Sequence, residues 1–134
     1  MDIAGFSAKL NAWLAGAALP LWRDKGFDAK TGGFVETIDM AGRPTRADRR
    51  ARVQPRQVYC FAEAGRRGWT GDWQTVAVQG IAYFDRVYLQ PDGFYGALAD
   101  ADGHLIDGSF DLYNQAFALL SFAYLAQVFP DRQA

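Results

Sequence analysis

An arginine stands at the start of an otherwise apolar and aromatic stretch of this sequence. Residues 52–62 read RVQPRQVYCFA, so Arg56 follows a proline and precedes a run of apolar side chains. A positive charge in the first turn of a helix opposes the helix dipole, at a cost of about 0.3–1 kcal/mol. We therefore expect Arg56 to serve a ligand, by stabilising negative charge that develops on oxygen. The alternative is a structural ion pair with a nearby carboxylate such as Glu36 or Asp39.

Aromatic residues near this arginine are candidates for a binding pocket. Tyr113 lies at the start of a later apolar helix, at a position similar to that of Arg56, so its phenol should face the same pocket. Tyr59, one turn beyond Arg56, and Trp22 are candidates for the pocket wall. Each of these aromatic residues can instead be an ordinary part of the core, and for Tyr59 and Trp22 the core is the favoured interpretation.

Other reactive side chains give weaker signals. His104, the sole histidine, is a conceivable general base, but it follows a glycine turn and is typical of a solvated surface residue. Cys60 lies in the apolar stripe of a predicted helix, which indicates a small core residue. Residues 100–103 lack the glycine spacing and the closing glutamate of a calcium loop, and there is no zinc-ligand spacing or phosphate-binding glycine loop. We predict no metal and no cofactor.

The sequence contains one basic cluster, formed by Arg43, Arg46, Arg49, Arg50, Arg52 and Arg56. It could meet a phosphate group or nucleic acid. Asp48 interrupts the cluster and no aromatic residues interleave with it, so a solvated loop is the favoured interpretation. The formal net charge of −1 gives no long-range attraction to nucleic acid. We expect no nucleic-acid partner.

Composition and length indicate one folded domain. The chain has 134 residues, half of them hydrophobic and 15% aromatic. A single cysteine has no disulfide partner, which favours a reducing compartment. No targeting signal is recognisable and no apolar run approaches the roughly 18 residues of a membrane helix. The sequence therefore predicts a cytoplasmic protein with no membrane association.

Hydrophobic periodicity predicts helices separated by glycine-rich loops. A first helix should cover residues 4–18 and end at Leu19-Pro20, because proline disfavours helix in the residue before it. A second should begin near Arg56, and a third, amphipathic helix should cover 73–88. Residues 110–128 are apolar on nearly every side, which predicts a helix buried all round. Between the first two helices, residues 24–45 read as a short hairpin or an extended loop.

An internal repeat organises these elements. Gly33-Phe34, Asp39 and Gly42 are echoed by Gly93-Phe94, Asp100 and Gly103, at a spacing of about 60 residues, and each set precedes an aromatic helix. Stacked repeats need neighbours to bury the faces they share, and about three units are usually required. We therefore expect a truncated reading frame, or an oligomer that covers the helix at 110–128.

Several motifs together resemble the N-terminal part of the N-acylglucosamine 2-epimerase family, which also includes mannose isomerases and cellobiose 2-epimerases. They are Leu19-Pro-Leu-Trp22, Gly26-Phe-Asp28, Gly32-Gly-Phe34, Asp39, Gly42-Arg43, Val53-Gln-Pro-Arg56-Gln-Val-Tyr59 and Asp111-Leu-Tyr113-Asn-Gln-Ala-Phe117. The resemblance implies an all-α fold in which residues 1–134 form the first two helix pairs of an (α/α)6 barrel, with hairpin-like loops. Asn114 departs from the family pattern, where Tyr-Asp is often followed by His or Gln.

The same resemblance implies a function. Family members move the C2 proton of a ring-opened sugar through an enediolate, with no metal in the chemistry, and use histidines that lie on later helices. Arg56 matches the family arginine that faces the sugar oxygens, and the substrate would be a sugar or a sugar phosphate. Without those histidines the chain alone should be inactive.

Two further hypotheses stay open. The first is a non-catalytic helical module that binds sugar or protein and self-associates through residues 110–128. The second is a glycoside hydrolase or lyase, which needs two carboxylates across the scissile bond. Asp111 and Glu63 are the helix-borne acids near the right places, and Glu63 should lie two turns too deep.

Overall fold

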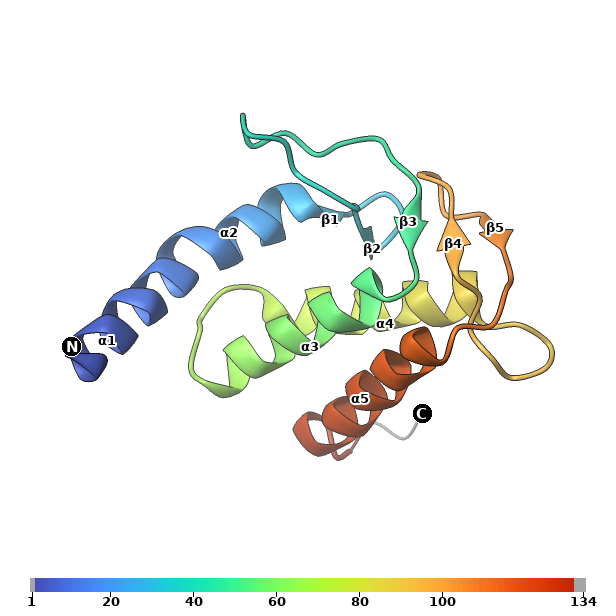
Figure 1. The fold of residues 1–134 in the computed structure, drawn as a ribbon. Helices are drawn as coiled ribbons and strands as arrows, with labels where there is room; N and C mark the ends of the chain where they lie inside the picture. The colour runs from blue at the N-terminus through green and yellow to red at the C-terminus, as the bar shows by residue number, and fades with distance from the viewer. Residues whose placement is uncertain (1, 132–134) are drawn as a thin grey trace.

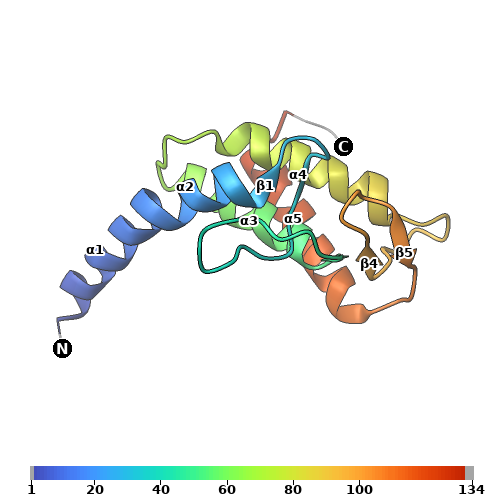
Figure 2. The ribbon, with the colours of Figure 1, turned by 90° about the horizontal axis from the view of Figure 1, so that it is seen from above.

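The computed structural model describes residues 2–131 and is built mainly from helices (Figure 1). The helical segments are α1 (Ile3–Trp13), η1 (Leu14–Ala18), α2 (Leu19–Leu21), η2 (Trp22–Gly26), α3 (Val53–Arg66), α4 (Trp73–Tyr88) and α5 (Leu112–Val128). The short strands are β1 (Phe27–Asp28), β2 (Gly33–Phe34), β3 (Arg49–Arg50), β4 (Leu98–Ala99) and β5 (Leu105–Asp107). Helices α3, α4 and α5 pack together, while α1 projects away from them (Figures 1 and 2).

The first helix is longer than the sequence predicts. It runs without a break from Ile3 to Gly26, because η1 and η2 are π-helical turns that continue α1 and α2. In η1 the Leu19 amide donates to the Leu14 carbonyl, five residues back. This wider turn relieves the clash that the Pro20 ring would make with the preceding α-helical turn. The predicted end at residue 18 is therefore wrong.

The next two helices agree better with the periodicity. Helix α4 has the bounds predicted for the third helix, and α3 begins at Val53, a few residues before Arg56. The two helices approach closely at Gly80, where an added Cβ would lie 2.9 Å from a methyl carbon of Val58. Residues Val76 and Ala77 of α4 are buried in the same apolar cluster. Small residues at this crossing allow α3 and α4 to pack closely.

The hairpin loops gather at one end of the helices (Figure 1). Strands β1 and β2 pair antiparallel, with Phe27 opposite Phe34. Strand β3 precedes α3 and pairs antiparallel with β4, which precedes α5, with Arg50 opposite Leu98. Strand β5 completes this three-stranded sheet. The sheet therefore joins the loop of the first repeat to the loop of the second.

The hydrogen bonds confirm the internal repeat and define its register. The Gln54 side chain accepts from the Phe34 amide at 2.8 Å and donates to the Phe34 carbonyl at 2.9 Å. Gln115, 61 positions later in the sequence, makes the same two bonds to Tyr95 at 3.0 and 2.8 Å. In this register Tyr113 is the equivalent of Arg52. The prediction that Tyr113 occupies a position similar to that of Arg56 is therefore wrong, because the helix starts are offset.

The hairpin tips follow the same register. A carboxylate oxygen of Asp39 accepts from the amides of Ala41 and Arg43, each at 2.9 Å. Asp100 accepts in the same way from two amides, also at 2.9 Å. Gly42 and Gly103 close these turns with φ of 77° and 88°, a left-handed conformation that glycine adopts without strain. Each tip is thus a self-contained turn built from its own aspartate and glycine.

Helix α5 is not buried on all sides, contrary to the sequence prediction. Its buried residues are Asn114, Ala118 and Ser121, all on the side that packs against the rest of the chain. Leu112 and Leu119 are 73% and 72% exposed. The prediction is wrong because only one neighbouring inner helix, α3, covers α5 among the described residues. Within residues 2–131 no helix is both long enough and apolar enough to cross a membrane.

Candidate functional site

The N-terminal ends of α3 and α5 meet at a group of charged and aromatic side chains. Arg52, which precedes α3, lies 3.0 Å from a carboxylate oxygen of Asp111, which precedes α5. Asp111 also caps α5 by accepting from the Tyr113 amide at 2.9 Å. One carboxylate thereby ties the two helix starts together and satisfies a free amide. We refer to Arg52, Arg56, Asp111, Tyr113 and Phe117 as the arginine–aromatic cluster.

Phe117 connects Arg56 to Tyr113. The guanidinium carbon of Arg56 lies 5.1 Å from the Phe117 ring centroid, and the Tyr113 ring meets Phe117 edge to face at 4.9 Å. The guanidinium of Arg52 lies 5.0 Å from the Tyr113 ring. Such contacts orient a guanidinium without neutralising its charge. The structure therefore brings together two of the residues that the sequence predicts for the site.

Arg56 differs from the rest of the basic cluster in its partners. The other arginines pair with carboxylates: Arg43 with Asp39, Arg46 with Asp102, Arg49 with Asp28, Arg50 with Glu36, and Arg52 with Asp111. Arg56 is exposed and forms no ion pair with any residue from 2 to 131. The alternative of a structural ion pair to Glu36 or Asp39 is wrong, because both carboxylates are occupied by other arginines. Among the described residues, the contact of its guanidinium is therefore with the Phe117 ring and not with a carboxylate.

Tyr59 and Trp22 lie apart from the cluster. The Tyr59 ring is part-buried and meets the Tyr124 ring edge to face at 4.8 Å. Trp22 is also part-buried and packs against the apolar core around Phe34. It lies against Gly26, where an added Cβ would come 2.1 Å from the indole ring. Their contacts within the chain are those of packed aromatic residues.

The carboxylates considered for hydrolysis are both occupied. Glu63 accepts from Arg66 at 2.9 Å and also pairs with Arg67 and the Tyr124 hydroxyl. Hydrogen bonds from Arg66, Tyr124 and Arg67 lower the pKa of Glu63 to about 2. A carboxylate held ionised in this way cannot act as a general acid. Asp111 is engaged by Arg52 and by its helix cap, so the two acids form no catalytic pair.

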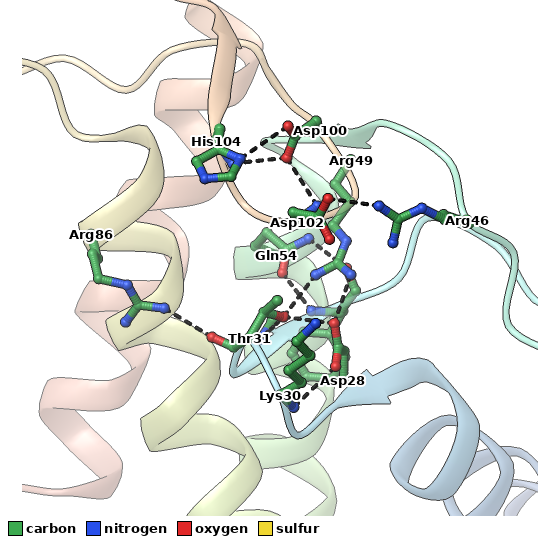
Figure 3. Close-up of polar contacts among 12 residues, drawn as sticks. Asp28, Lys30, Thr31, Arg46, Arg49, Gln54, Arg86, Asp100, Asp102 and His104 are labelled. Carbon is green, nitrogen blue, oxygen red and sulfur yellow. Dashed lines mark hydrogen bonds and ion pairs between the residues drawn. The ribbon is translucent and has the colours of Figure 1, made fainter.

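A buried arginine network beneath the hairpins was not predicted from the sequence. Arg49, with its side chain 5% exposed, donates to Asp28 at 2.8 Å and to the Thr31 hydroxyl at 2.9 Å (Figure 3). Burial alone would raise the pKa of Asp28, but hydrogen bonds from Arg49 and Thr31 outweigh it and lower that pKa. The Tyr88 hydroxyl donates to the Arg49 carbonyl at 2.8 Å. Nothing in the periodicity distinguished Arg49 from its exposed neighbours.

The remaining reactive residues have simple environments. His104 is a surface residue, as predicted, with its side chain 75% exposed and its ring 3.1 Å from Asp100 (Figure 3). Cys60 is exposed rather than in the core, so that prediction is wrong. The helices next to α3 cover only part of its apolar stripe. Cys60 lies at the edge of the stripe that they leave uncovered. Among the described residues no three His, Cys, Asp or Glu side chains gather in a way that could hold a metal ion.

A hollow beside the inner helix α3 is a groove rather than a closed pocket. It has a volume of about 1120 Å³ and lies between the first helix and α3. Leu14, Ala15 and Leu19 form one wall, and Tyr59, Cys60 and Ala64 form the other. Arg56 and Tyr113 are not part of its lining. This groove is therefore distinct from the arginine–aromatic cluster.

Comparisons with known proteins identify relatives over the whole chain. The sequence pattern of the N-acylglucosamine 2-epimerase (GlcNAc 2-epimerase) family matches residues 32–134. The chain is 72% identical over 134 residues to a mannose-6-phosphate isomerase of Rhizobium meliloti (strain 1021), and covers 35% of that protein. The chain thus spans about a third of this relative.

Two solved structures have a fold similar to that of this chain. Cellobiose 2-epimerase from Bacillus thermoamylovorans B4167 superimposes with a TM-score of 0.86 at 18% identity, over 96% of this chain and 33% of that one. D-Mannose isomerase gives a TM-score of 0.79 at 20% identity, over 90% of this chain and 32% of that one. At these identities the likeness shows the fold. The chain folds as a part of an (α/α)6 barrel, as the sequence predicted.

Proposed function

Because this chain belongs to the N-acylglucosamine 2-epimerase family, a family of sugar epimerases and isomerases, we propose that it supplies part of the active site of such an enzyme. The substrate class is a sugar or a sugar phosphate. The 72% identity to a mannose-6-phosphate isomerase favours isomerisation, with mannose 6-phosphate as the first substrate to test. The chain covers 35% of that relative, so the proposed activity belongs to an assembled barrel rather than to these residues alone.

The proposed chemistry is a proton transfer next to a carbonyl group. A general base removes the C2 proton of the open-chain aldose, and the electron pair forms a C1–C2 double bond as negative charge moves onto O1. Transfer of the O2 proton to O1, with return of a proton to C1, gives the ketose. Return of the proton to the opposite face of C2 gives the epimer. The family resemblance assigns the acid and base to histidines outside this chain, and exposed His104 is not proposed for that role.

Arg56 is proposed to stabilise the enediolate oxygens. The observation that carries this proposal is that Arg56 lacks a carboxylate partner while the other arginines of the basic cluster each have one. In comparable oxyanion sites, one fixed donor aimed at the developing charge lowers the activation free energy by about 2.7–4 kcal/mol. Phe117 holds the guanidinium from one side and leaves its N–H donors available. Tyr113, half-exposed beside it, is proposed to contact a sugar hydroxyl.

Tyr59 and Trp22 are proposed as more distant members of the sugar-binding wall. Both are part-buried and packed against other aromatic rings or the core, so their contribution would be to shape the wall. The hydrolase alternative has no support, because Glu63 and Asp111 are each engaged by arginine. The binding-module alternative keeps one supporting observation, the exposed apolar surface of α5.

The test is a chimera in which residues 1–134 replace the corresponding part of the Rhizobium relative. Arg56→Ala should lower turnover of mannose 6-phosphate by at least about 10²-fold, the effect of losing one oxyanion donor. Arg43→Ala is the matched control, since that side chain is 77% exposed and pairs only within its own hairpin. Unchanged turnover in Arg56→Ala would remove Arg56 from the mechanism. Sugar binding by the chimera without turnover would favour the binding module.

A further inference from the structure

Arg52 holds Tyr113 at two points. Its guanidinium carbon lies over the Tyr113 ring, 5.0 Å from the ring centroid. A terminal nitrogen of Arg52 also donates to one carboxylate oxygen of Asp111 at 3.0 Å, and the other oxygen of Asp111 accepts from the Tyr113 amide at 2.9 Å. Arg52 therefore contacts the Tyr113 ring directly and reaches the Tyr113 backbone through the cap of α5.

The Tyr113 ring in turn limits where Arg56 can lie. It stands edge to face against Phe117, with an angle of 87° between the ring planes and 4.9 Å between the centroids. The Arg56 guanidinium lies over the Phe117 ring at 5.1 Å. If Tyr113 moved away, the Phe117 ring would be free to turn, and the Arg56 guanidinium would lose the orientation that the ring gives it. Arg52 is thus connected to Arg56 through two aromatic rings.

The ion pair of Arg52 contributes little to stability by itself. The side chains of Arg52 and Asp111 are 30% and 38% exposed, so water screens their attraction. Arg46 and Asp102 form a comparable pair at 2.6 Å, which also joins the first repeat to the second (Figure 3). That pair lies between the hairpins, away from the helix starts. What distinguishes Arg52 is therefore its contact with Tyr113.

We propose that Arg52 is a positioning residue for the reaction at this site: it fixes the Tyr113 ring, and through Phe117 the Arg56 guanidinium, in the orientation that meets the sugar oxygens. The inference rests on the proposed function of Arg56 and Tyr113. A donor that is already oriented need not rearrange as charge develops, which lowers the barrier. A planar guanidinium can stack on a ring while one nitrogen donates to a carboxylate, whereas a lysine ammonium is a point charge.

The decisive experiment is a double-mutant cycle on Arg52 and Tyr113 in the chimeric enzyme described above, with mannose 6-phosphate as substrate. Arg52→Gln should lower kcat by about 10-fold or more, since small misplacements of a catalytic group are costly. In the Tyr113→Ala background the same change should lower kcat by less than about 2-fold, because the ring through which Arg52 acts is gone. Tyr113→Phe is the matched background: it keeps the ring and removes only the hydroxyl, so the full effect of Arg52→Gln should persist.

Kinetic constants and stability separate positioning from a merely structural role. Both kcat and kcat/KM should fall in Arg52→Gln, because Arg56 is proposed to act on charge that develops in the transition state. Arg52→Lys should keep the urea unfolding midpoint of the wild type, because a positive charge still faces Asp111, and should still lose turnover. Arg46→Gln is the matched control: it removes a pair between the same two repeats and should leave turnover unchanged.

Other outcomes would contradict this role for Arg52. A rise in KM with kcat unchanged would show that Arg52 affects binding alone. Equal losses from Arg52→Gln with and without the Tyr113 ring would show that Arg52 does not act through that ring. Full turnover in Arg52→Lys would show that a positive charge is sufficient.

The proposed function fails in a different way. An inactive wild-type chimera, or full turnover in Arg56→Ala, would refute the role of Arg56, and the inference about Arg52 would fall with it. A loss in Arg56→Ala without a loss in Arg52→Gln would overturn only the inference about Arg52.

Discussion

The Gln54 side chain offers the sharpest test of how the loops are held on the inner helices. It is completely buried and makes two hydrogen bonds, at 2.8 and 2.9 Å, to the backbone of Phe34. Gln54→Met keeps the approximate volume but leaves a buried N–H and a buried C=O without partners. Each such group costs about 1–3 kcal/mol, so the free energy of unfolding should fall by about 2–6 kcal/mol.

Gln115→Met is the matched variant within the same chain. Gln115 makes the same two bonds to Tyr95 but is only part-buried, so water can replace them. The loss should then approach the net value of two hydrogen bonds, about 1–3 kcal/mol. Urea unfolding at one fixed protein concentration measures both, and hydrogen exchange at the Phe34 amide locates the effect. A Gln54→Met loss below about 0.5 kcal/mol, or one smaller than that of Gln115→Met, would refute the reasoning.

The remaining predictions concern stability and can be measured by the same unfolding experiments. Asp28→Asn should lower the free energy of unfolding by about 3 kcal/mol, at the lower end of the range for breaking a buried ion pair. The loss is expected because the Arg49 side chain, which is 5% exposed, would keep its charge without its partner. A decrease under about 1 kcal/mol would contradict this. Glu63 has a folded pKa of about 2, below its unfolded value of 4.5, so its contribution is present above pH 4.5 and is lost as pH falls toward 2. Glu63→Gln should therefore make the loss of stability between pH 5 and 2 smaller, and identical pH profiles would show that the ion pairs contribute nothing. Gly33→Ala should cost about 1–3 kcal/mol because the new Cβ would lie 2.5 Å from a buried tyrosine ring, whereas Gly16→Ala, with open space around it, should not destabilise the fold.

Much of the fold could be predicted from local patterns. The bounds of α4 followed from its apolar stripe, and the repeat followed from the spacing of glycine, aspartate and aromatic residues. The end of the first helix could not be predicted, because the π-helical turns around Pro20 depend on backbone bonds that no residue pattern specifies. Whether Cys60 and Leu119 are exposed depends on which other helices pack against them. Hydrophobic periodicity within one helix carries no information about that.

The candidate site, like the fold, was predictable only in part. The sequence singled out Arg56 and Tyr113, and the structure brings both onto Phe117. It could not show that Arg52, a near neighbour in the same motif, pairs with Asp111 while Arg56 forms no ion pair among residues 2–131. The two arginines lie one helical turn apart, and their partners come from a segment about 60 residues away. Only the packing of α3 against α5 distinguishes them.

The sequence by itself determined the helical repeat, the turn chemistry of the hairpins and the family to which the chain belongs, because each depends on residue types at short, fixed spacings. The tertiary structure decided which charges are neutralised and which apolar faces remain open. Both depend on distances between segments that are far apart in the chain. For this protein those distances leave Arg56 without an ion pair among residues 2–131, and leave Leu112 and Leu119 of α5 exposed.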